Sequence, residues 1–207
     1  MNNKIPEKVV GRFTLYHSIL LEYIEEGIEL ISSPQIAARL GIDDSQVRKD
    51  FILLKKSGMR RIGYSVKELK ETLEKSLGFA DKKDAFIIGA GYLGLALAKY
   101  DNFMYYGLNI LALFDNDPLK VDMQIGDKMI FHISKLSNLV NRLNVDIAIL
   151  TVPKAHAQKV TDLLAEAGIK YIWNFTPAVL KVPPEVKVCN ENIMASFLRF
   201  AYKDIQQ

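Results

Sequence analysis

A group of glycines near residue 90 carries the most recognisable chemistry in this chain. Gly89, Gly91 and Gly94 follow the apolar segment Phe86–Ile88 and precede an apolar segment with the character of a helix. Glycines at this spacing, between a strand and a helix, allow a tight turn, a close approach of backbone to a pyrophosphate, and close packing of the helix on the strand. Amide groups at the start of the helix would hold the phosphates. The pattern predicts a dinucleotide-binding turn.

An acidic residue follows the next predicted strand, residues 108–114. That strand leads into Asp115 and Asn116, about 20 positions beyond Gly94, which is the spacing at which an acid holds the adenosine ribose of a dinucleotide. A carboxylate there would also repel a 2′-phosphate, so we expect NAD(H) as the cofactor in preference to NADP(H). The alternative is an acid that only caps the following helix.

Two later strands are predicted to end in polar residues and prolines. Residues 145–152 lead to the motif Thr151-Val152-Pro153, and residues 171–175 lead into the motif 174–177. An open α/β sheet binds its ligand at the carboxyl ends of adjacent strands, so we expect the nicotinamide here, although prolines that only end the strands are an equal alternative. The predicted cofactor-binding residues are Gly89, Ala90, Gly91, Tyr92, Leu93, Gly94, Asp115, Asn116, Thr151, Val152, Pro153, Asn174, Phe175 and Pro177.

Basic residues are concentrated between Ser45 and Tyr64. This stretch holds six lysines and arginines and one acid, Asp50, whereas the net charge of the whole chain is only +3. A run of charges is most often a solvated surface, but a cluster this dense also suits the binding of phosphates. The residues predicted to contact DNA are Gln46, Arg48, Lys49, Lys55, Lys56, Arg60, Arg61 and Tyr64.

The elements that would carry these cations are helices. Three helices are predicted in this region; the second begins at a Ser33 cap and ends at Gly41, and the third begins with a capping box at Asp43 and ends at Gly58. Two short helices joined by a tight turn, the second basic in its first turns, form a helix-turn-helix. Residues 60–64 would form a basic wing. This arrangement is typical of DNA-binding domains.

From Lys83 onward, predicted strands and helices alternate, which is typical of a parallel Rossmann sheet. The predicted fold class is therefore α/β, with a winged helix-turn-helix DNA-binding domain in residues 1–80, an NAD(H)-binding Rossmann domain in residues 81–190, and a C-terminal helix in residues 191–207. This last helix is strongly apolar on one face. The face would dock either on its own domain or, by exchange, on a partner subunit, and helix-turn-helix readers usually act as dimers.

Composition excludes several classes of protein. The apolar runs are far shorter than a membrane span, and no signal segment opens the chain. The single cysteine, Cys189, excludes an internal disulfide and a cysteine-rich metal site. We expect a soluble cytoplasmic protein without a metal centre.

Further short motifs run through the whole chain. They include Ile5-Pro6, Ser32-Ser33, the segment Gln46-Val47-Arg48-Lys49-Asp50, Gly63-Tyr64, Phe114-Asp115-x-Asp117-Pro118, Thr151-Val152-Pro153, Asn174-Phe175-x-Pro177 and Val182-Pro183. Together with the glycine turn, they resemble the Rex family of redox-sensing transcriptional repressors over essentially the entire chain. The resemblance implies a homodimer with a domain-swapped C-terminal helix that binds operator double-stranded DNA. It also implies that NADH, but not NAD⁺, releases the protein from DNA.

The chain departs from the family pattern in two places. The segment Phe51–Ser57 lacks the serine, tyrosine and first glycine usual after Asp50, which leaves the operator sequence open. In the family, an arginine of the first helix and an aspartate at the start of the swapped helix form a contact that changes between ligand states. Those positions are Ser18 and Asn192 here, while Tyr100 matches the tyrosine that competes for the aspartate. We expect these three switch residues to give a weakened or altered response to NADH.

Two other classes of protein remain as alternatives. One is an NAD-dependent dehydrogenase, which needs an acid–base group near the nicotinamide. Of the three histidines, only His156 could lie there, so we expect a regulator and not an enzyme. The other is a nucleotide sensor that has lost sequence-specific DNA recognition. The unusual segment Phe51–Ser57 favours it, and the clustered cations oppose it.

Overall fold

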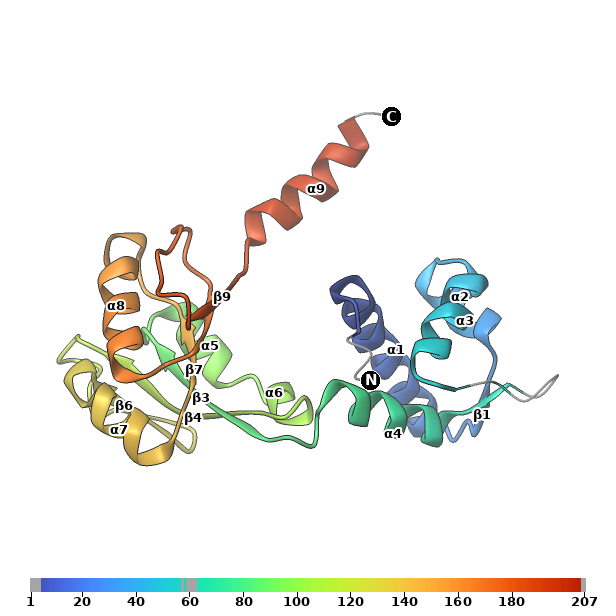
Figure 1. The fold of residues 1–207 in the computed structure, drawn as a ribbon, viewed down its shortest axis with the longest axis horizontal. Coiled ribbons are helices and arrows are strands. Elements are labelled where there is room, and N and C mark those ends of the chain that lie inside the picture. The colour runs from blue at the N-terminus through green and yellow to red at the C-terminus, as the bar shows by residue number, and fades with distance from the viewer. Residues whose placement is uncertain (1–4, 57, 59–62, 206–207) are drawn as a thin grey trace. The chain divides into compact units, whose positions relative to one another are not determined.

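The computed structural model describes residues 5–56, 58 and 63–205 (Figure 1). The chain divides into two compact units, an N-terminal unit, Met1–Asp81, and a C-terminal unit, Lys82–Gln207. Each unit has hydrophobic clusters of its own, as expected of structural domains. The functional roles given above to residues 1–80, 81–190 and 191–207 stay predictions.

The N-terminal unit is a small helical fold with one two-stranded ribbon. Its elements are α1 (Glu7–Glu25), β1 (Leu30–Ile31), α2 (Ser33–Leu40), α3 (Asp44–Leu53), β2 (Tyr64–Ser65) and α4 (Val66–Leu77). Strands β1 and β2 pair antiparallel, which brings the segment after α3 back beside the segment before α2. The helices enclose one core, whose fully buried side chains include Phe13, Tyr16, Leu20, Ile36, Val47, Phe51 and Leu73.

Local signals explain where α2 and α3 begin, and the prediction misplaced two boundaries. The cap of α2 is Ser32, not Ser33, and it forms a capping box with Gln35. Helix α3 starts after Asp43, whose side chain accepts a hydrogen bond from the Ser45 amide, and it ends at Leu53, not at Gly58. The reason is Lys55, which adopts a left-handed backbone with φ of 54°. Lys55 and Lys56 therefore lie beyond the helix.

Helix α4 was not predicted, although its ends carry clear signals. Ser65 caps its start by accepting from the Glu68 amide, and Gly78 ends it with φ of 72°. Its buried residues Val66, Leu69 and Leu73 lie at helical spacing against α1. The N-terminal unit thus contains a fourth helix that supports the first one.

The C-terminal unit is built on a seven-stranded sheet. Its strands are β3 (Lys83–Ile88), β4 (Leu108–Asp115), β5 (Gln124–Ile125), β6 (Lys128–His132), β7 (Ile147–Leu150), β8 (Tyr171–Asn174) and β9 (Lys187–Asn190). They lie in the order β5-β6-β4-β3-β7-β8-β9, and every pair is parallel except β5–β6. The order reverses at β3, which lies between β4 and β7, and such a switch point is where doubly wound sheets bind ligands. The predicted α/β fold class is confirmed.

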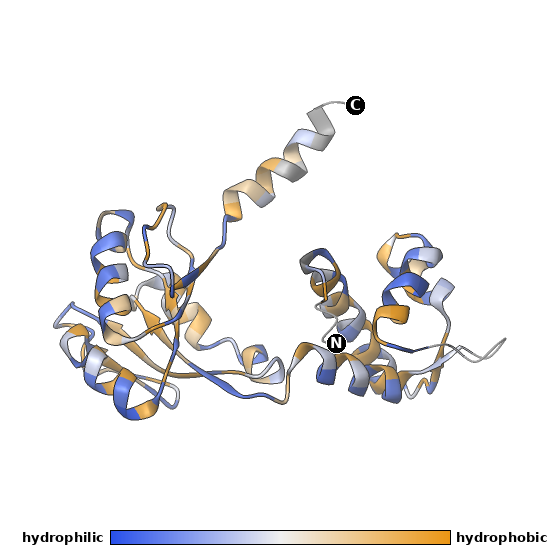
Figure 2. Ribbon diagram, in the orientation of Figure 1, coloured by the Kyte–Doolittle hydropathy of each residue, from blue (hydrophilic) through white to orange (hydrophobic). Residues whose placement is uncertain are grey.

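Helices cover both faces of this sheet (Figure 1). They are α5 (Tyr92–Ala98), α6 (Asn102–Tyr105), α7 (Leu136–Leu143) and α8 (Lys154–Ala167), with a short 3₁₀ turn, η1 (Ile133–Lys135), before α7. Along β3, Phe86 and Ile88 pack in the cluster with α7 and α8, and Ala85 and Ile87 pack in the cluster with α5 and α6. This alternation buries the strand on both faces, so the strand sequence is almost continuously apolar. Figure 2 shows hydrophobic residues concentrated in these strands.

The last element, α9 (Ile193–Ile205), is rich in hydrophobic residues (Figure 2). Ile193, Met194, Phe197, Leu198 and Tyr202 are each more than half exposed. Isolated helices of this length are marginal in water, so such a face normally requires a packing partner. Elsewhere in the described ranges, as in α9, no helix is long and apolar enough to cross a bilayer.

Candidate nucleotide site and nucleic-acid interface

The predicted glycine turn connects β3 to α5. Gly89 has a φ of 105°, a conformation that favours glycine. A Cβ on Gly94 would lie 1.9 Å from the Gly89 carbonyl oxygen, so only glycine fits where the helix meets the turn. A Cβ on Gly91 would meet no atom within 4 Å. The backbone at Gly91 is therefore open to a ligand at the start of α5, where helix amides favour phosphate.

Thr151, predicted to lie beside the nicotinamide, braces the glycine turn. Its Oγ1 donates to the carbonyl oxygens of Ile88 at 3.1 Å and Gly89 at 2.9 Å. Thr151 follows β7, the neighbour of β3, so the switch point brings these residues together although they are about 60 positions apart. Pro153 is the residue before α8, and like Tyr92 of the glycine turn it is exposed.

Asp115 also reaches the glycine turn. Its Oδ2 accepts from the Ala90 amide at 2.7 Å, and its Oδ1 accepts from the amides of Asn116 at 2.8 Å and Asp117 at 2.9 Å. Lys120 Nζ lies 3.5 Å from Oδ2. The carboxylate that the sequence assigned to a ribose thus lies at the carboxyl end of β4, beside the turn. It also holds the turn and the segment after β4 in place.

Asn174 shapes the loop after β8 with its whole amide group. Its Nδ2 donates to the Ala178 carbonyl oxygen at 3.1 Å and to Asn190 Oδ1 at 2.8 Å, and its Oδ1 accepts from both the amide and the hydroxyl of Thr176. The side chain is buried. Asn174 was predicted as a cofactor contact, whereas the donors and the acceptor of its amide are engaged within the chain.

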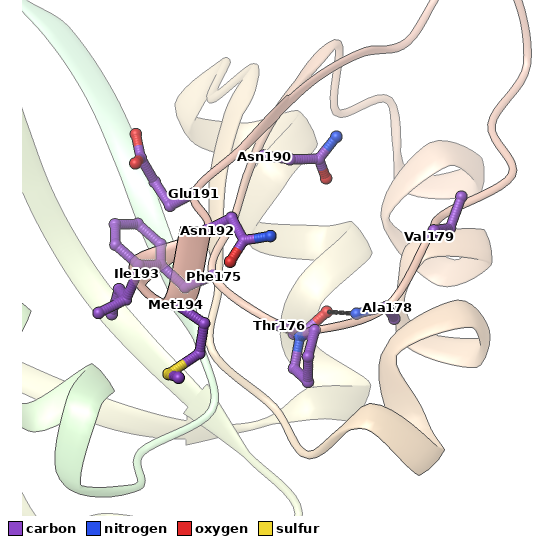
Figure 3. A pocket seen from close by; sticks show the side chains of 10 residues that line it. Phe175, Thr176, Ala178, Val179, Asn190, Glu191, Asn192, Ile193 and Met194 are labelled. Atoms are coloured by element: carbon purple, nitrogen blue, oxygen red, sulfur yellow. Dashed lines mark hydrogen bonds between the residues drawn. The ribbon is translucent and has the colours of Figure 1, made fainter. Parts of the chain in front are cut away.

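A pocket opens between this loop and the start of α9 (Figure 3). Its volume is about 400 Å³, which is within the range of small-molecule sites. It is lined by Phe175, Thr176, Pro177, Ala178, Val179, Asn190, Glu191, Asn192, Ile193 and Met194. The predicted nicotinamide residues Phe175 and Pro177 therefore share one cavity with the predicted switch residue Asn192.

The three predicted switch positions carry no charge, and their described contacts are local. The Ser18 hydroxyl donates to the Thr14 carbonyl oxygen at 3.2 Å, within α1. Asn192 Oδ1 accepts from the Ala195 amide at 2.8 Å and so caps α9. Tyr100 is half exposed, and its ring packs edge-on against Phe103 at 5.0 Å between centroids.

Helix α3 presents a basic outer face. Arg48 and Lys49 are exposed, whereas Val47, Asp50 and Phe51 are buried. Arg48 pairs with Asp44 one turn earlier, with Nη2 3.1 Å from Oδ1 and a second, shorter contact between Nη1 and Oδ2. The first turns of the second helix of a helix-turn-helix are those that enter the major groove.

The other residues predicted to contact DNA differ in what their side chains contact. Lys56 Nζ pairs with Glu68 Oε2 at 3.2 Å. The Tyr64 ring packs edge-on against Phe51 at 4.9 Å and so supports the core of the N-terminal unit. Gln46 points its amide nitrogen at Asp50 Oδ1, 2.9 Å away, on the buried side of α3. Arg60 and Arg61 lie outside the described residues.

Sequence reasoning missed the group of side chains around Asp50. Arg12 and Tyr16 of α1 both donate to this buried carboxylate. Burial alone would raise the pKa of Asp50, but the hydrogen bonds from Arg12, Tyr16 and Gln46 hold that pKa below its usual value. One signal was available: Asp50 lies on the apolar face of α3 between Val47 and Leu54. A buried carboxylate must have partners.

Asp50, Glu74 and Asp115 should make both units sensitive to acid. Burial raises the pKa of Asp115, but backbone hydrogen bonds from Asp117 and Ala90 and the charge of Lys120 leave it lowered, and the pKa of Glu74 is lowered in the same manner by Lys70 and His17. A folded-state pKa below the unfolded value of about 4 stabilises the fold above that pH. This stabilisation is lost as pH falls through the folded-state pKa values.

The measurement is the urea midpoint of unfolding between pH 7 and pH 3. We expect the urea concentration at the midpoint to decrease once the pH is below about 4. In Asp115→Asn, the C-terminal unit should be less stable at pH 7 and should change less on acidification, because its amide does not titrate. An unchanged acid response in this variant would mean that other carboxylates dominate.

Within residues 5–56, 58 and 63–205, no cluster of His, Cys, Asp and Glu side chains could hold a metal ion.

Comparison with known proteins covers both units. The family model "CoA binding domain" matches residues 80–178, and "Putative DNA-binding protein N-terminus" matches residues 4–51. A redox-sensing transcriptional repressor Rex from Thermosipho africanus is 39% identical over 203 residues, covering 98% of this chain and 97% of the relative. A Rex repressor from Syntrophomonas wolfei is 40% identical over 190 residues, covering 92% and 90%.

Solved structures similar to this chain include those of a protein from the same family as these relatives. RSP, a Rex-family repressor, in complex with β-NAD⁺ and operator DNA, has a TM-score of 0.88 and 35% identity over 98% of this chain and 93% of its own. Its complex with β-NADH has a TM-score of 0.85 and covers 98% and 95%. Because sequence and structure match these repressors over nearly their full length, through both the helix-turn-helix and the nucleotide-binding sheet, the chain belongs to the Rex family of redox-sensing transcriptional repressors.

Proposed function

We propose that this protein is a transcriptional repressor that binds operator DNA and leaves it when NADH binds. The observation that carries the proposal is the near-complete match to RSP. One structure of RSP contains β-NAD⁺ and operator DNA, and another contains β-NADH. The two halves that such a protein needs occur together in this chain. Helix α3 exposes Arg48 and Lys49, and the glycine turn at the switch point of the sheet is open above Gly91.

The residues of the C-terminal unit fit a dinucleotide. Amides at Gly91 and the start of α5 would hold the pyrophosphate, and Asp115 the adenosine ribose. The pocket that contains Phe175 and Pro177 would receive the nicotinamide. Reduced nicotinamide is uncharged and the oxidised ring is a cation, so the apolar side chains of this pocket, among them Phe175 and Ile193, would favour the reduced form. Because Asn192 and Ile193 line the same pocket, the ring would contact the segment from which α9 begins.

The N-terminal unit would read DNA with α3. Arg48 and Lys49 would contact base edges in the major groove, and Lys55, Lys56, Arg60 and Arg61 would bind phosphates. We assign Tyr64 to supporting α3 from behind, since its ring packs on Phe51. Phosphate contacts of this number predict a steep fall of affinity with salt.

A second copy of the chain is the proposed partner of α9. The exposed side chains Ile193, Phe197 and Leu198 would be buried by exchange of the helix between subunits. A two-fold dimer would present two copies of α3 to two half-sites. Preference of NADH for one dimer arrangement would shift the population away from the arrangement whose spacing matches the operator. We place this activity in the cytoplasm, with the DNA.

DNA binding and nucleotide binding can both be tested on one preparation of the protein. A duplex library with a random central segment, selected by the protein without ligand, should yield an inverted repeat. The chain has one tryptophan, Trp173, whose ring lies 4.9 Å from that of Phe175 in the nicotinamide pocket. NADH absorbs at the wavelengths where tryptophan emits, so NADH should quench Trp173 and NAD⁺ should not. No enriched duplex, or no binding of either nucleotide, would contradict the proposal.

An altered operator is the second candidate, and the residue types of the segment Phe51–Ser57 favour it. The helix stops at Leu53, and Lys55 turns the chain out of the helix with its left-handed backbone. Both positions lie in the segment Phe51–Ser57, which departs from the family pattern. The same selection decides the question, because the recovered repeat can be compared directly with the operator DNA of RSP.

The switch positions give a further prediction. Introducing both charges of the family contact, as S18R/N192D, should increase the ratio of operator affinity without and with NADH by about tenfold, a typical allosteric coupling of 1–3 kcal/mol. Aspartate caps a helix as well as asparagine, so α9 should be retained. Each single variant introduces one unpartnered charge and is the control. An equal ratio in the wild type and the double variant would mean that the response does not depend on this contact.

A further inference from the structure

We propose that Arg12 and Tyr16 of α1 act as positioning residues that set the rotation of α3 by holding the carboxylate of Asp50, whose side chain Gln46 of the same helix orients. The inference deepens the proposed function and rests on it, since it assigns α3 to DNA. We call these four residues the Asp50 clamp. None of the clamp residues is assigned to contact DNA in this proposal, including Gln46, which the sequence suggested as a base reader.

The contacts of the Asp50 clamp use the full accepting capacity of the carboxylate. Arg12 donates from Nε to Oδ2 at 2.5 Å and from Nη2 to Oδ1 at 2.8 Å, a two-point contact of fixed geometry. The Tyr16 hydroxyl donates to Oδ2 at 2.8 Å, and Gln46 Nε2 donates to Oδ1 at 2.9 Å. Each oxygen therefore accepts two hydrogen bonds. The direction of the Asp50 side chain is defined by three residues on two helices.

The clamp affects the exposed basic residues of α3 because Asp50 directly follows Arg48 and Lys49 in the sequence. Side chains reach about 5–6 Å from a helix axis, so a rotation of α3 by about 20° would move their outer atoms by about 2 Å. Hydrogen bonds to base edges tolerate only a few tenths of an ångström around about 2.9 Å. A small rotation would therefore break base contacts and leave long cations within reach of phosphates.

A role in positioning explains the clamp better than a role in stability. A buried ion pair contributes little net stability compared with apolar side chains of similar volume, because its charges must leave water. The core around Asp50 is otherwise apolar, with Val47 and Phe51 fully buried beside it and Tyr16 packed edge-on against Phe51 at 5.4 Å. Directional hydrogen bonds on α3, in contrast, specify one orientation of the helix.

The test compares Arg12→Met, Tyr16→Phe and Gln46→Ala with the wild type in the full-length protein. For each, fluorescence anisotropy gives the ratio of affinities for the selected duplex and for a scrambled duplex of equal composition. Arg39→Met is the matched control, because Arg39 of α2 also pairs with a carboxylate of α1, Glu22, but is exposed and does not contact Asp50. Thermal unfolding reports the stability of each variant.

We expect Arg12→Met to lower this ratio by about tenfold or more, and Tyr16→Phe by less, with affinity for the scrambled duplex changed little beyond the effect of removing one charge. Arg39→Met should keep the ratio within about twofold. A merely structural role would lower the melting temperature and leave the ratio of the folded protein unchanged. Where Arg12→Met does not fold, Tyr16→Phe decides, because it keeps the ring and removes one donor.

A scan of single base-pair changes in the selected duplex then identifies the role of Gln46. Loss of a base reader relaxes preference at one position of each half-site, whereas loss of the clamp weakens preference at all positions read by α3. We expect the second pattern. Variants that discriminate as well as the wild type, or a one-position effect of Gln46→Ala, would overturn the inference. A wild-type protein that does not discriminate would overturn the proposed function, and the clamp with it.

Discussion

Replacing Gly91 by alanine should abolish NADH binding and leave the fold intact. A Cβ at this position meets no protein atom within 4 Å, and the backbone is extended with φ of −80°, so alanine fits the protein alone. The added methyl group would fill the space that a pyrophosphate needs for its close approach to the turn. We expect a loss of at least about 100-fold in NADH affinity, about 3 kcal/mol, measured by the quenching of Trp173.

Gly94→Ala is the informative comparison. Its methyl group would lie 1.9 Å from the Gly89 carbonyl oxygen and 2.9 Å from Thr151 Oγ1, so this variant should also lose thermal stability. Gly91→Ala should melt like the wild type, bind operator DNA, and fail to release it when NADH is added. Normal NADH affinity in Gly91→Ala would mean that the phosphates do not lie over this turn.

Removing Arg48 and Lys49 together should eliminate operator binding at moderate salt. Each base contact in the major groove contributes about 1–3 kcal/mol, so the double variant R48A/K49A should lose about 100-fold or more in affinity. If either side chain binds a phosphate instead, the slope of log affinity against log salt becomes shallower by about one for each phosphate that is no longer bound. Anisotropy at several salt concentrations measures both effects.

Lys159→Ala on α8 is the control for this experiment, because it removes an exposed positive charge from the other unit. It should leave operator affinity nearly unchanged. NADH binding should be normal in both variants. An R48A/K49A protein that still selects the same duplex would place the DNA interface away from α3.

The parts of the site that are local in sequence could be predicted. The glycine turn and Asp115 follow from a strand, a turn and a second strand, and the structure joins them through the hydrogen bond from the Ala90 amide. The structural context of Asp50 could not be predicted in this way. Its partners Arg12 and Tyr16 lie 38 and 34 positions earlier, so only the packing of α1 against α3 brings them together.

The predicted end of α3 was wrong for a similar physical reason. The apolar residues after Asp50 continue a helical pattern, but the backbone at Lys55 is left-handed and ends α3 early. A lysine rarely adopts that conformation, so neither composition nor periodicity signals the end of the helix. Asn174 makes contacts that its place at a strand end does not reveal, because its amide donates to Asn190 of β9 and to Ala178 of the following loop. Its contact with the cofactor stays a prediction.

The most direct test of the proposed function measures the coupling between DNA binding and nucleotide binding. The selected duplex, labelled with a fluorophore, is bound by the wild-type protein at constant salt and titrated with NADH and, separately, with NAD⁺. Quenching of Trp173 reports NADH binding, and the loss of this quenching when NAD⁺ displaces NADH reports NAD⁺ binding. We expect NADH to lower operator affinity more than NAD⁺ does, over the range in which NADH occupies the protein. Equal operator affinity with the site filled by NADH, NAD⁺ or no nucleotide would contradict a redox-sensing repressor.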